Sequence, residues 1–150
     1  MAPAAARVVS DFEQMSGPRS DAEPGVVDLS TIEQDLRARR YAEEMGDELG
    51  LPVSVVSEPR DAVIGRDLVV TAGPILKTPH ATIQPGWLEE GAFASMVDYD
   101  SYWHRDALAE SDKFCTDDTP QLRFYQEEGY FQQIPPVHAD LGELVTGRKP

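Results

Sequence analysis

Asp98 and Asp100 are candidates for acid–base chemistry, because they flank Tyr99 directly after the apolar run 92–97. If the strand continued through them, their two-residue spacing would place both carboxylates on one face, where each raises the pKa of the other. A proton-transfer role would follow from that arrangement. The alternative is a solvated acidic loop in a very acidic protein, and the residues alone favour this second interpretation.

Asp28 has the position of a cofactor-binding acid. It stands near the end of the apolar run 25–29, just before a helical pattern. An acidic residue at such a point accepts hydrogen bonds from the ribose hydroxyls of NAD, although an ordinary turn or helix-cap aspartate would look the same. The loop Gly-x-Gly-x-x-Gly that should precede this acid is absent from residues 1–24. The residues by themselves therefore give weak support to dinucleotide binding.

A further candidate strand end follows the apolar run 67–72. Thr71, Ala72 and Gly73 lie there, and Val97 ends the next apolar run along the chain. Ligands of open parallel sheets bind at the carboxyl ends of the strands. We therefore expect these four residues to border a bound cofactor.

Metal and disulfide chemistry are not expected. The single cysteine, Cys115, has no partner for a disulfide or for a metal-binding pair, and we interpret it as a small apolar residue. The histidines are far apart in the sequence, so a zinc site would need the fold to bring them together. They are His80, His104 and His138.

Charge and hydropathy exclude several classes of protein. The 150 residues include 27 acidic and 13 basic side chains, for a net charge of −14, which repels phosphate backbones and disfavours a nucleic-acid partner. No run has the apolar length of a membrane span, and the first residues lack the apolar core of a signal peptide. We therefore expect a cytoplasmic protein without a membrane partner.

The elements that must position these residues alternate between strand and helix. Residues 1–24 show no sustained periodicity and predict a loose, at most weakly helical arm. The most regular helix is predicted at 32–49 and ends at Gly50. The other predicted elements are strands at 25–29, 52–56, 67–72, 92–97 and 113–116, and helices at 58–64, 87–91, 104–110, 119–127 and 139–146. Continuous apolar runs between helices predict a partial Rossmann-like α/β domain over residues 25–150, a parallel sheet with helices on both faces.

Four segments, taken together, resemble the ornithine cyclodeaminase/mu-crystallin family. Their order and spacing match over roughly residues 25–150. The segments are RRYAEEM at 39–45, DAVIGRDLVVTA at 61–72, WLEEGA at 87–92 and DLGELVTGRKP at 140–150. The resemblance implies NAD- or NADP-dependent chemistry on a Rossmann domain. It also implies dimerisation through a second domain, which the relatives build from both chain ends.

The resemblance also implies roles for particular residues. It places the family's catalytic aspartate on Asp100, which would position and deprotonate an amino acid or amine substrate. Cyclodeaminases have small glycines just before that aspartate, where this chain has Asp98 and Tyr99. Ornithine is therefore not the expected substrate. The string 97–103 is more similar to a subgroup of the family named after the second of the tyramine oxidase subunits.

Three hypotheses follow. In the first, the chain belongs to an NAD-dependent enzyme in which hydride leaves the substrate carbon for NAD, a nucleophile meets the imine, and ammonia departs before hydride returns. In the second, it is an accessory subunit of an amine (tyramine) oxidase system, or a mu-crystallin-like cofactor binder, with Tyr99, Tyr130 and Phe131 as an interaction surface. Core packing of these aromatic residues is the interpretation that the sequence favours. In the third, the chain is a truncated and inactive product, because the phosphate loop and substrate domain are missing.

Overall fold

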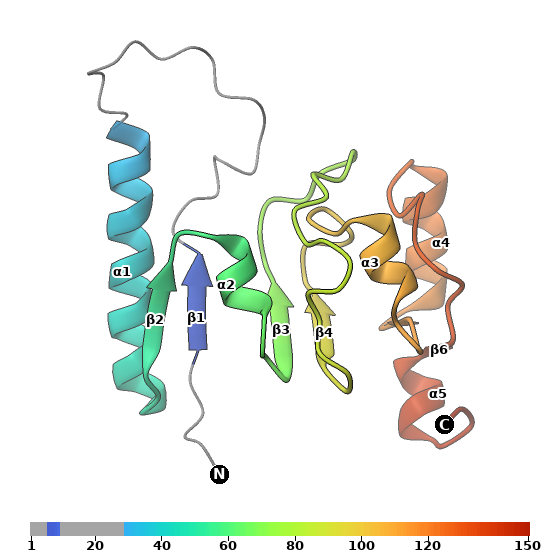
Figure 1. Ribbon diagram of the computed structural model, residues 1–150. Helices are drawn as coiled ribbons and strands as arrows, with labels where there is room; N and C mark the ends of the chain where they lie inside the picture. The colour runs from blue at the N-terminus through green and yellow to red at the C-terminus, as the bar shows by residue number, and fades with distance from the viewer. Residues whose placement is uncertain (1–5, 10–28) are drawn as a thin grey trace. The chain divides into compact units, whose positions relative to one another are not determined.

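The computed structural model describes residues 6–9 and 29–150 (Figure 1). The chain divides into two compact units, Met1–Ile64 and Gly65–Pro150, and each unit is described by itself.

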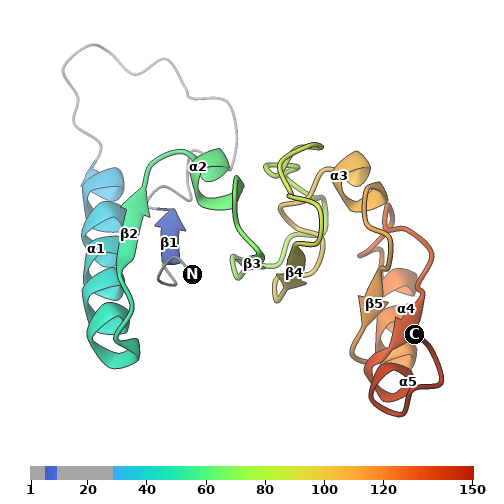
Figure 2. The same ribbon diagram turned by 60° about the horizontal axis from the view of Figure 1, so that its bottom comes forward.

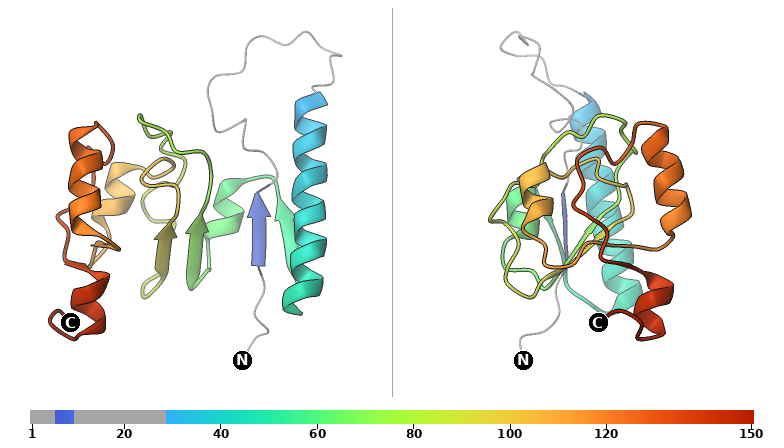
Figure 3. Two further views of the ribbon diagram at one scale, coloured as in Figure 1. Left: turned by 180° about the vertical axis from the view of Figure 1, so that it is seen from behind. Right: turned by 90° about the vertical axis from the view of Figure 1, so that its right-hand side faces the viewer.

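The first unit contains a parallel strand pair and a long helix. β1 (Ala6–Val9) pairs in parallel with β2 (Val53–Val56), with Ala6 opposite Val53. Between the two strands, α1 (Leu29–Leu49) lies alongside β2 in Figures 1 and 3, and α2 (Pro59–Val63) follows β2. A strand, a helix and a parallel strand in this order form the repeating unit of α/β folds.

Small side chains form the buried face of α1. Ala38 and Ala42 are buried and lie one helical turn apart, while Leu36, Tyr41 and other large residues of the helix are exposed. Short side chains at this spacing allow close approach of the helix to its neighbour. Gly50, with φ of 64°, ends the helix in the left-handed conformation that the sequence predicted for it.

β1 corrects the prediction for residues 1–24, because the expected loose arm contains a strand. The sequence Ala-Arg-Val-Val is too short a pattern to identify a strand, which is defined here by its pairing with β2. The rest of that arm, and the strand predicted at 25–29, lie outside the described residues, except for Leu29. That residue is the first of α1, which therefore begins three residues before the predicted start.

The second unit begins with another parallel pair. β3 (Leu68–Thr71) pairs with β4 (Phe93–Met96), and their arrows run the same way in Figure 3. The backbone N–H of Val97 donates to the Thr71 carbonyl at 2.9 Å, which extends the ladder past the end of both strands. Parallel pairing thus places the two carboxyl ends at one edge.

Three helices and a third parallel pair complete this unit (Figures 1 and 2). They are α3 (Arg105–Ala109), β5 (Cys115–Thr116), α4 (Thr119–Glu127), β6 (Ala139–Asp140) and α5 (Leu141–Val145). β5 pairs with β6, with Cys115 opposite Ala139. The helices begin at polar caps: the Asp118 carboxylate accepts the N–H of Gln121 at 2.8 Å, and Asp140 forms a capping box with Glu143.

The parallel α/β pattern predicted from the sequence is confirmed, since every described strand pair is parallel. The helix predicted at 87–91 is wrong, because Gly86 and Gly91 adopt φ of 75° and 82° and leave too few residues between them for a helix. The predicted helix 139–146 begins later, because its first two residues form β6.

Candidate functional site

Asp98 ties the ends of β3 and β4 together. Its carboxylate accepts hydrogen bonds from the Thr71 hydroxyl at 2.6 Å and from the Gly73 backbone N–H at 2.8 Å. The Thr71 oxygen in turn accepts from the indole N–H of Trp103 at 3.1 Å. Asp98 is 1% exposed and Trp103 is 2% exposed, so this network lies inside the unit. A buried carboxylate with two donors is a structural anchor.

The chain leaves β4 through turns that place Asp100. The hydroxyl of fully buried Ser101 donates to the Asp98 carbonyl and accepts from the Leu76 N–H at 2.9 Å. The Ser101 carbonyl accepts from the His80 N–H at 2.7 Å. Since turns and not a strand carry these residues, the two-residue spacing does not put Asp98 and Asp100 on a common strand face. The prediction of a solvated acidic loop is wrong, because both aspartates are buried.

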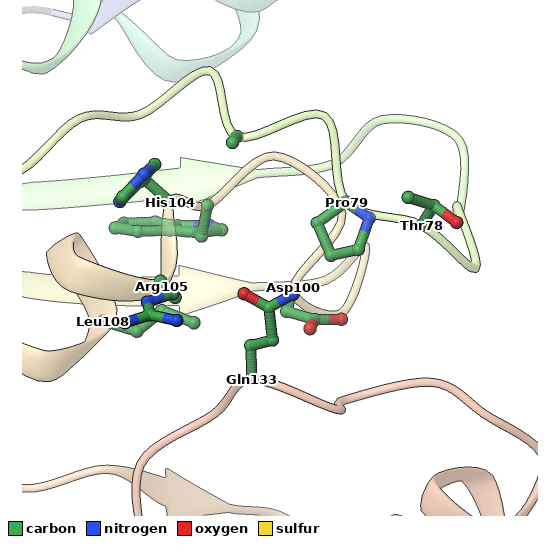
Figure 4. Close-up of a pocket in the computed structure, with 9 residues that line it drawn as sticks. Thr78, Pro79, Asp100, His104, Arg105, Leu108 and Gln133 are labelled. Atoms are coloured by element: carbon green, nitrogen blue, oxygen red, sulfur yellow. The ribbon is translucent and has the colours of Figure 1, made fainter.

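Asp100 lines a hollow of about 170 Å³, and all of the lining residues come from the second unit. The lining consists of Thr78, Pro79, Ala81, Asp100, Trp103, His104, Arg105, Leu108 and Gln133. Figure 4 shows Asp100 and Gln133 near the centre of the view, with His104 and Arg105 to their left. The hollow therefore brings a carboxylate, an amide, an imidazole and a guanidinium around one small volume.

The carboxylate of Asp100 is buried and incompletely paired. The side chain is 2% exposed, and its Oδ1 has no hydrogen-bond partner within the described part of the chain. Burial raises the pKa of Asp100 above its ordinary value, while the backbone N–H groups of Asp100 itself and of Phe131 act in the opposite direction. A buried acceptor without a donor is uncommon and costs free energy, so this oxygen marks a place where a ligand donor can bind.

The wall of the hollow is formed in part by the start of α3. The Nδ1 atom of His104 accepts the Asp106 backbone N–H at 3.1 Å and caps the helix. Arg105 is exposed, and its Nε lies 3.2 Å from the Asp106 carboxylate. Positive charge and hydrogen-bonding nitrogen atoms therefore stand on the same hollow as Asp100.

The residues predicted to border a cofactor lie together at the carboxyl ends of β3 and β4. Ala72 is exposed and Val97 is 63% exposed. The Thr71 hydroxyl and the Gly73 N–H are turned inward, because both bind Asp98. Asp28, the predicted ribose-binding acid, lies outside the described residues.

The histidines do not come together. His80 pairs through Nδ1 with the Thr82 hydroxyl at 3.0 Å, and His138 lies with Nε2 3.0 Å from the Pro150 carbonyl. Over residues 6–9 and 29–150, no group of three or more metal-binding side chains is arranged to hold an ion. Cys115 is half-buried in β5. None of the helices in that part of the chain is both long and apolar enough to cross a membrane.

Tyr99 lies in a cluster of aromatic rings that the sequence did not reveal as a unit. Its ring centroid is 4.5 Å from that of Phe131, 5.2 Å from that of Tyr125 and 5.8 Å from that of Tyr130. Phe131 is 9% exposed, which confirms core packing for this residue. Burial, and then the Tyr125 hydroxyl, raise the pKa of Tyr99 to about 12, so its hydroxyl keeps its proton at neutral pH.

Sequence reasoning missed the loop residues that complete the hollow. Thr78, Pro79 and Gln133 belong to segments without regular structure, and none forms part of a recognisable motif. Trp103 was also missed, although a tryptophan just after two acidic residues is a signal that the chain turns back into the core.

The parallel strand pairs, the intervening helices and the polar residues at the carboxyl ends define a Rossmann-like α/β protein. The sequence model of the ornithine cyclodeaminase/mu-crystallin family matches residues 21–150. The chain therefore belongs to the ornithine cyclodeaminase/mu-crystallin family.

A solved structure with the same fold is Δ1-pyrroline-2-carboxylate reductase from Thermococcus litoralis, in complex with NADH and L-proline. The two superpose with a TM-score of 0.60 and 20% sequence identity, over 97% of this chain and 47% of the reductase. The chain thus spans about half the length of that relative. Comparison with curated proteins gave no match.

Proposed function

We propose that the chain forms the cofactor-binding part of an NAD-dependent enzyme that acts at the amine-bearing carbon of an amino acid or amine. The observation that carries this proposal is Asp100, a buried carboxylate whose Oδ1 lacks a donor among the described residues and which lines a hollow just past β4. Membership of the family and the NADH bound to the reductase from Thermococcus litoralis support the choice of cofactor.

The carboxyl ends of β3 and β4 fit a nicotinamide cofactor. Ala72 and Val97 present exposed apolar atoms there, and Gly73 adds no side chain. Because the Thr71 hydroxyl and the Gly73 N–H already bind Asp98, this edge would contact the cofactor mainly through apolar and carbonyl atoms. When bound, the cofactor would supply hydride transfer to or from the substrate carbon.

Asp100 would hold the amino group of the substrate. A substrate N–H donating to Oδ1 would remove the cost of leaving that oxygen unpaired. Burial raises the pKa of the carboxyl, which makes the carboxylate a stronger base than an exposed aspartate. The same group could therefore orient the amine and accept its proton.

Arg105 would distinguish an amino acid from a simple amine. Its guanidinium lines the hollow that contains Asp100, and the nearby Asp106 is exposed and only partly neutralises it. A substrate carboxylate would be attracted to this charge, whereas a simple ammonium ligand would gain nothing from it. This argument favours an amino acid.

The strand found at Ala6–Val9 changes the choice of ribose-binding acid. In the sequence, Asp11 follows β1 by two positions, whereas Asp28 directly precedes α1. Both aspartates lie outside the described residues. Since ligand-binding acids follow strands in such folds, the rule that pointed to Asp28 now favours Asp11.

Titration of the chain with NADH tests cofactor binding, through energy transfer from its two tryptophans to the reduced nicotinamide. Asp11→Asn should weaken binding at least fivefold, while Asp28→Asn should leave it unchanged. The reverse ranking would return the ribose to Asp28. Absence of binding at millimolar NADH would refute the cofactor assignment for this chain.

A second titration tests the hollow, with NADH saturating and L-proline or tyramine added. Asp100→Asn should weaken whichever ligand binds by at least tenfold, and Arg105→Gln should weaken only L-proline. The exposed Asp112→Asn serves as the matched control. Binding of NADH without either amine would instead favour a cofactor-binding accessory role.

A further inference from the structure

Two aromatic residues with an unusual backbone conformation bracket Asp100. Tyr99 has φ of 64° and Phe131 has φ of 52°. In the part of the chain that the structure describes, only one other residue besides glycine has a positive φ, and this is Ala81, which lines the hollow. A left-handed backbone is unfavourable for a residue with a side chain, and it persists only where the surrounding packing holds it.

The packing that holds Tyr99 and Phe131 is their own contact. The two ring centroids lie 4.5 Å apart with an interplanar angle of 39°, which is a favourable aromatic arrangement. Tyr125 and Tyr130 pack against Tyr99 from other directions. The ring of Tyr99 is therefore enclosed by three others, and the backbone on either side of Asp98–Asp100 is fixed by side-chain packing.

The segment that carries Phe131 is held on both sides. The Gln126 side chain donates to the Phe131 carbonyl at 3.3 Å, and the Gln132 side chain donates to the Tyr130 carbonyl at 2.8 Å. The Lys77 ammonium lies 5.5 Å from the centroid of the Tyr130 ring, a cation–π contact. These contacts fix the direction of the Phe131 backbone N–H, which acts on the Asp100 carboxylate.

We propose that Tyr99 and Phe131 form an aromatic clamp that positions Asp100. Their stacked rings hold the Phe131 N–H against the carboxylate, so that the other oxygen, Oδ1, stays unpaired and available to a ligand in the hollow. Tyr99 and Phe131 are then positioning residues and not a surface for a partner protein. The use made of Asp100 rests on the proposed function, whereas the clamp itself can be tested without any ligand.

Other groups near Asp100 can be separated from it in a titration. His104 and Arg105 face it from α3 across the hollow, while Asp117 acts on the Tyr99 side of the clamp. Asp98 is engaged by Thr71 and Gly73. An Asp100→Asn variant identifies which changes belong to Asp100.

The test follows the Phe131 amide proton by NMR between pH 3 and 8 in the full 150-residue chain. Its chemical shift should move with the protonation of Asp100, and this movement should disappear in Asp100→Asn. Tyr99→Leu and Phe131→Leu each remove one ring of the clamp. Each should abolish the movement and speed hydrogen exchange at residue 131 at least tenfold.

Two controls preserve the clamp. Tyr99→Phe keeps the ring, and Phe124→Leu removes an exposed ring that contacts Tyr125 but not the Tyr99–Phe131 pair. Both should retain the titration of the Phe131 amide. The clamp is wrong if this amide does not titrate in the parent chain, or if its titration survives in a folded Tyr99→Leu or Phe131→Leu chain. Should both leucine variants unfold while Tyr99→Phe folds, the rings are required for the whole unit, and a role specific to Asp100 is rejected.

Discussion

Replacing Asp98 by asparagine tests the anchor that joins the ends of β3 and β4. The carboxylate accepts from two donors, the Thr71 hydroxyl at 2.6 Å and the Gly73 N–H at 2.8 Å. An asparagine amide has only one acceptor atom. If its oxygen accepts from the fixed Gly73 N–H, its NH₂ group faces the Thr71 oxygen, which already accepts from the Trp103 indole. The Thr71 hydroxyl then loses its acceptor.

The magnitude follows from the kind of hydrogen bond that is exchanged. A bond to a charged group contributes about 1.5–3 kcal/mol and a neutral one about 0.5–1.5 kcal/mol. Both bonds of Asp98 change from the first kind to the second, while the cost of burying the charge is removed. We expect Asp98→Asn to lower the free energy of unfolding by about 1–3 kcal/mol.

Urea unfolding followed by tryptophan fluorescence measures this change, because Trp103 is buried beside the network. The exposed Asp112→Asn is the control and should shift the midpoint little. In a double-mutant cycle with Thr71→Val, the two changes should be coupled by about 1 kcal/mol or more. If Asp98→Asn is no more destabilising than Asp112→Asn, or if the cycle shows no coupling, the carboxylate is not the anchor described here.

Three further predictions concern stability. Since burial raises the folded-state pKa of Asp100, its contribution to stability is fully present below its ordinary pKa of about 3.9 and is lost as pH rises through the raised value. Asp100→Asn should remove this fall, as urea midpoints measured from pH 4 to 8 would show. Asp140→Ala removes the capping box of α5 and should cost about 1 kcal/mol, with faster exchange of the Glu143 amide. Gly129→Ala should cost about 1–2 kcal/mol, because φ is 91° and the new Cβ would lie 2.9 Å from Lys77; Lys77→Ala should relieve only the steric part, and full recovery would contradict the backbone argument.

The order of strands and helices was predictable where the hydrophobic pattern is long. The helix ending at Gly50 and the helix 119–127 follow from apolar spacing and from capping residues, which are local properties of the chain. β1 was not predictable, because four residues become a strand only through pairing with β2, more than forty positions away. The turn at 87–91 was mistaken for a helix, since the left-handed glycines on either side do not show in the hydrophobic pattern.

The candidate site was predictable in part. The strand-end rule brought Thr71 and Val97 together correctly, and the family resemblance singled out Asp100. The division of labour between the two aspartates was not predictable. Asp98 is anchored by donors from β3 and the loop that follows it, and Asp100 is turned to the hollow, because the chain reverses in turns after Met96.

The cap of α3 fixes the tautomer of an imidazole on the wall of the hollow. Nδ1 of His104 accepts the Asp106 N–H, so in the neutral ring the hydrogen resides on Nε2. The hollow is therefore lined by a ring that can donate from Nε2 and by a carboxylate that can accept at Oδ1. Adding a proton to Nδ1 would exchange that acceptor for a donor and uncap the helix, so the protonation state of one ring links the start of α3 to the polarity of the hollow.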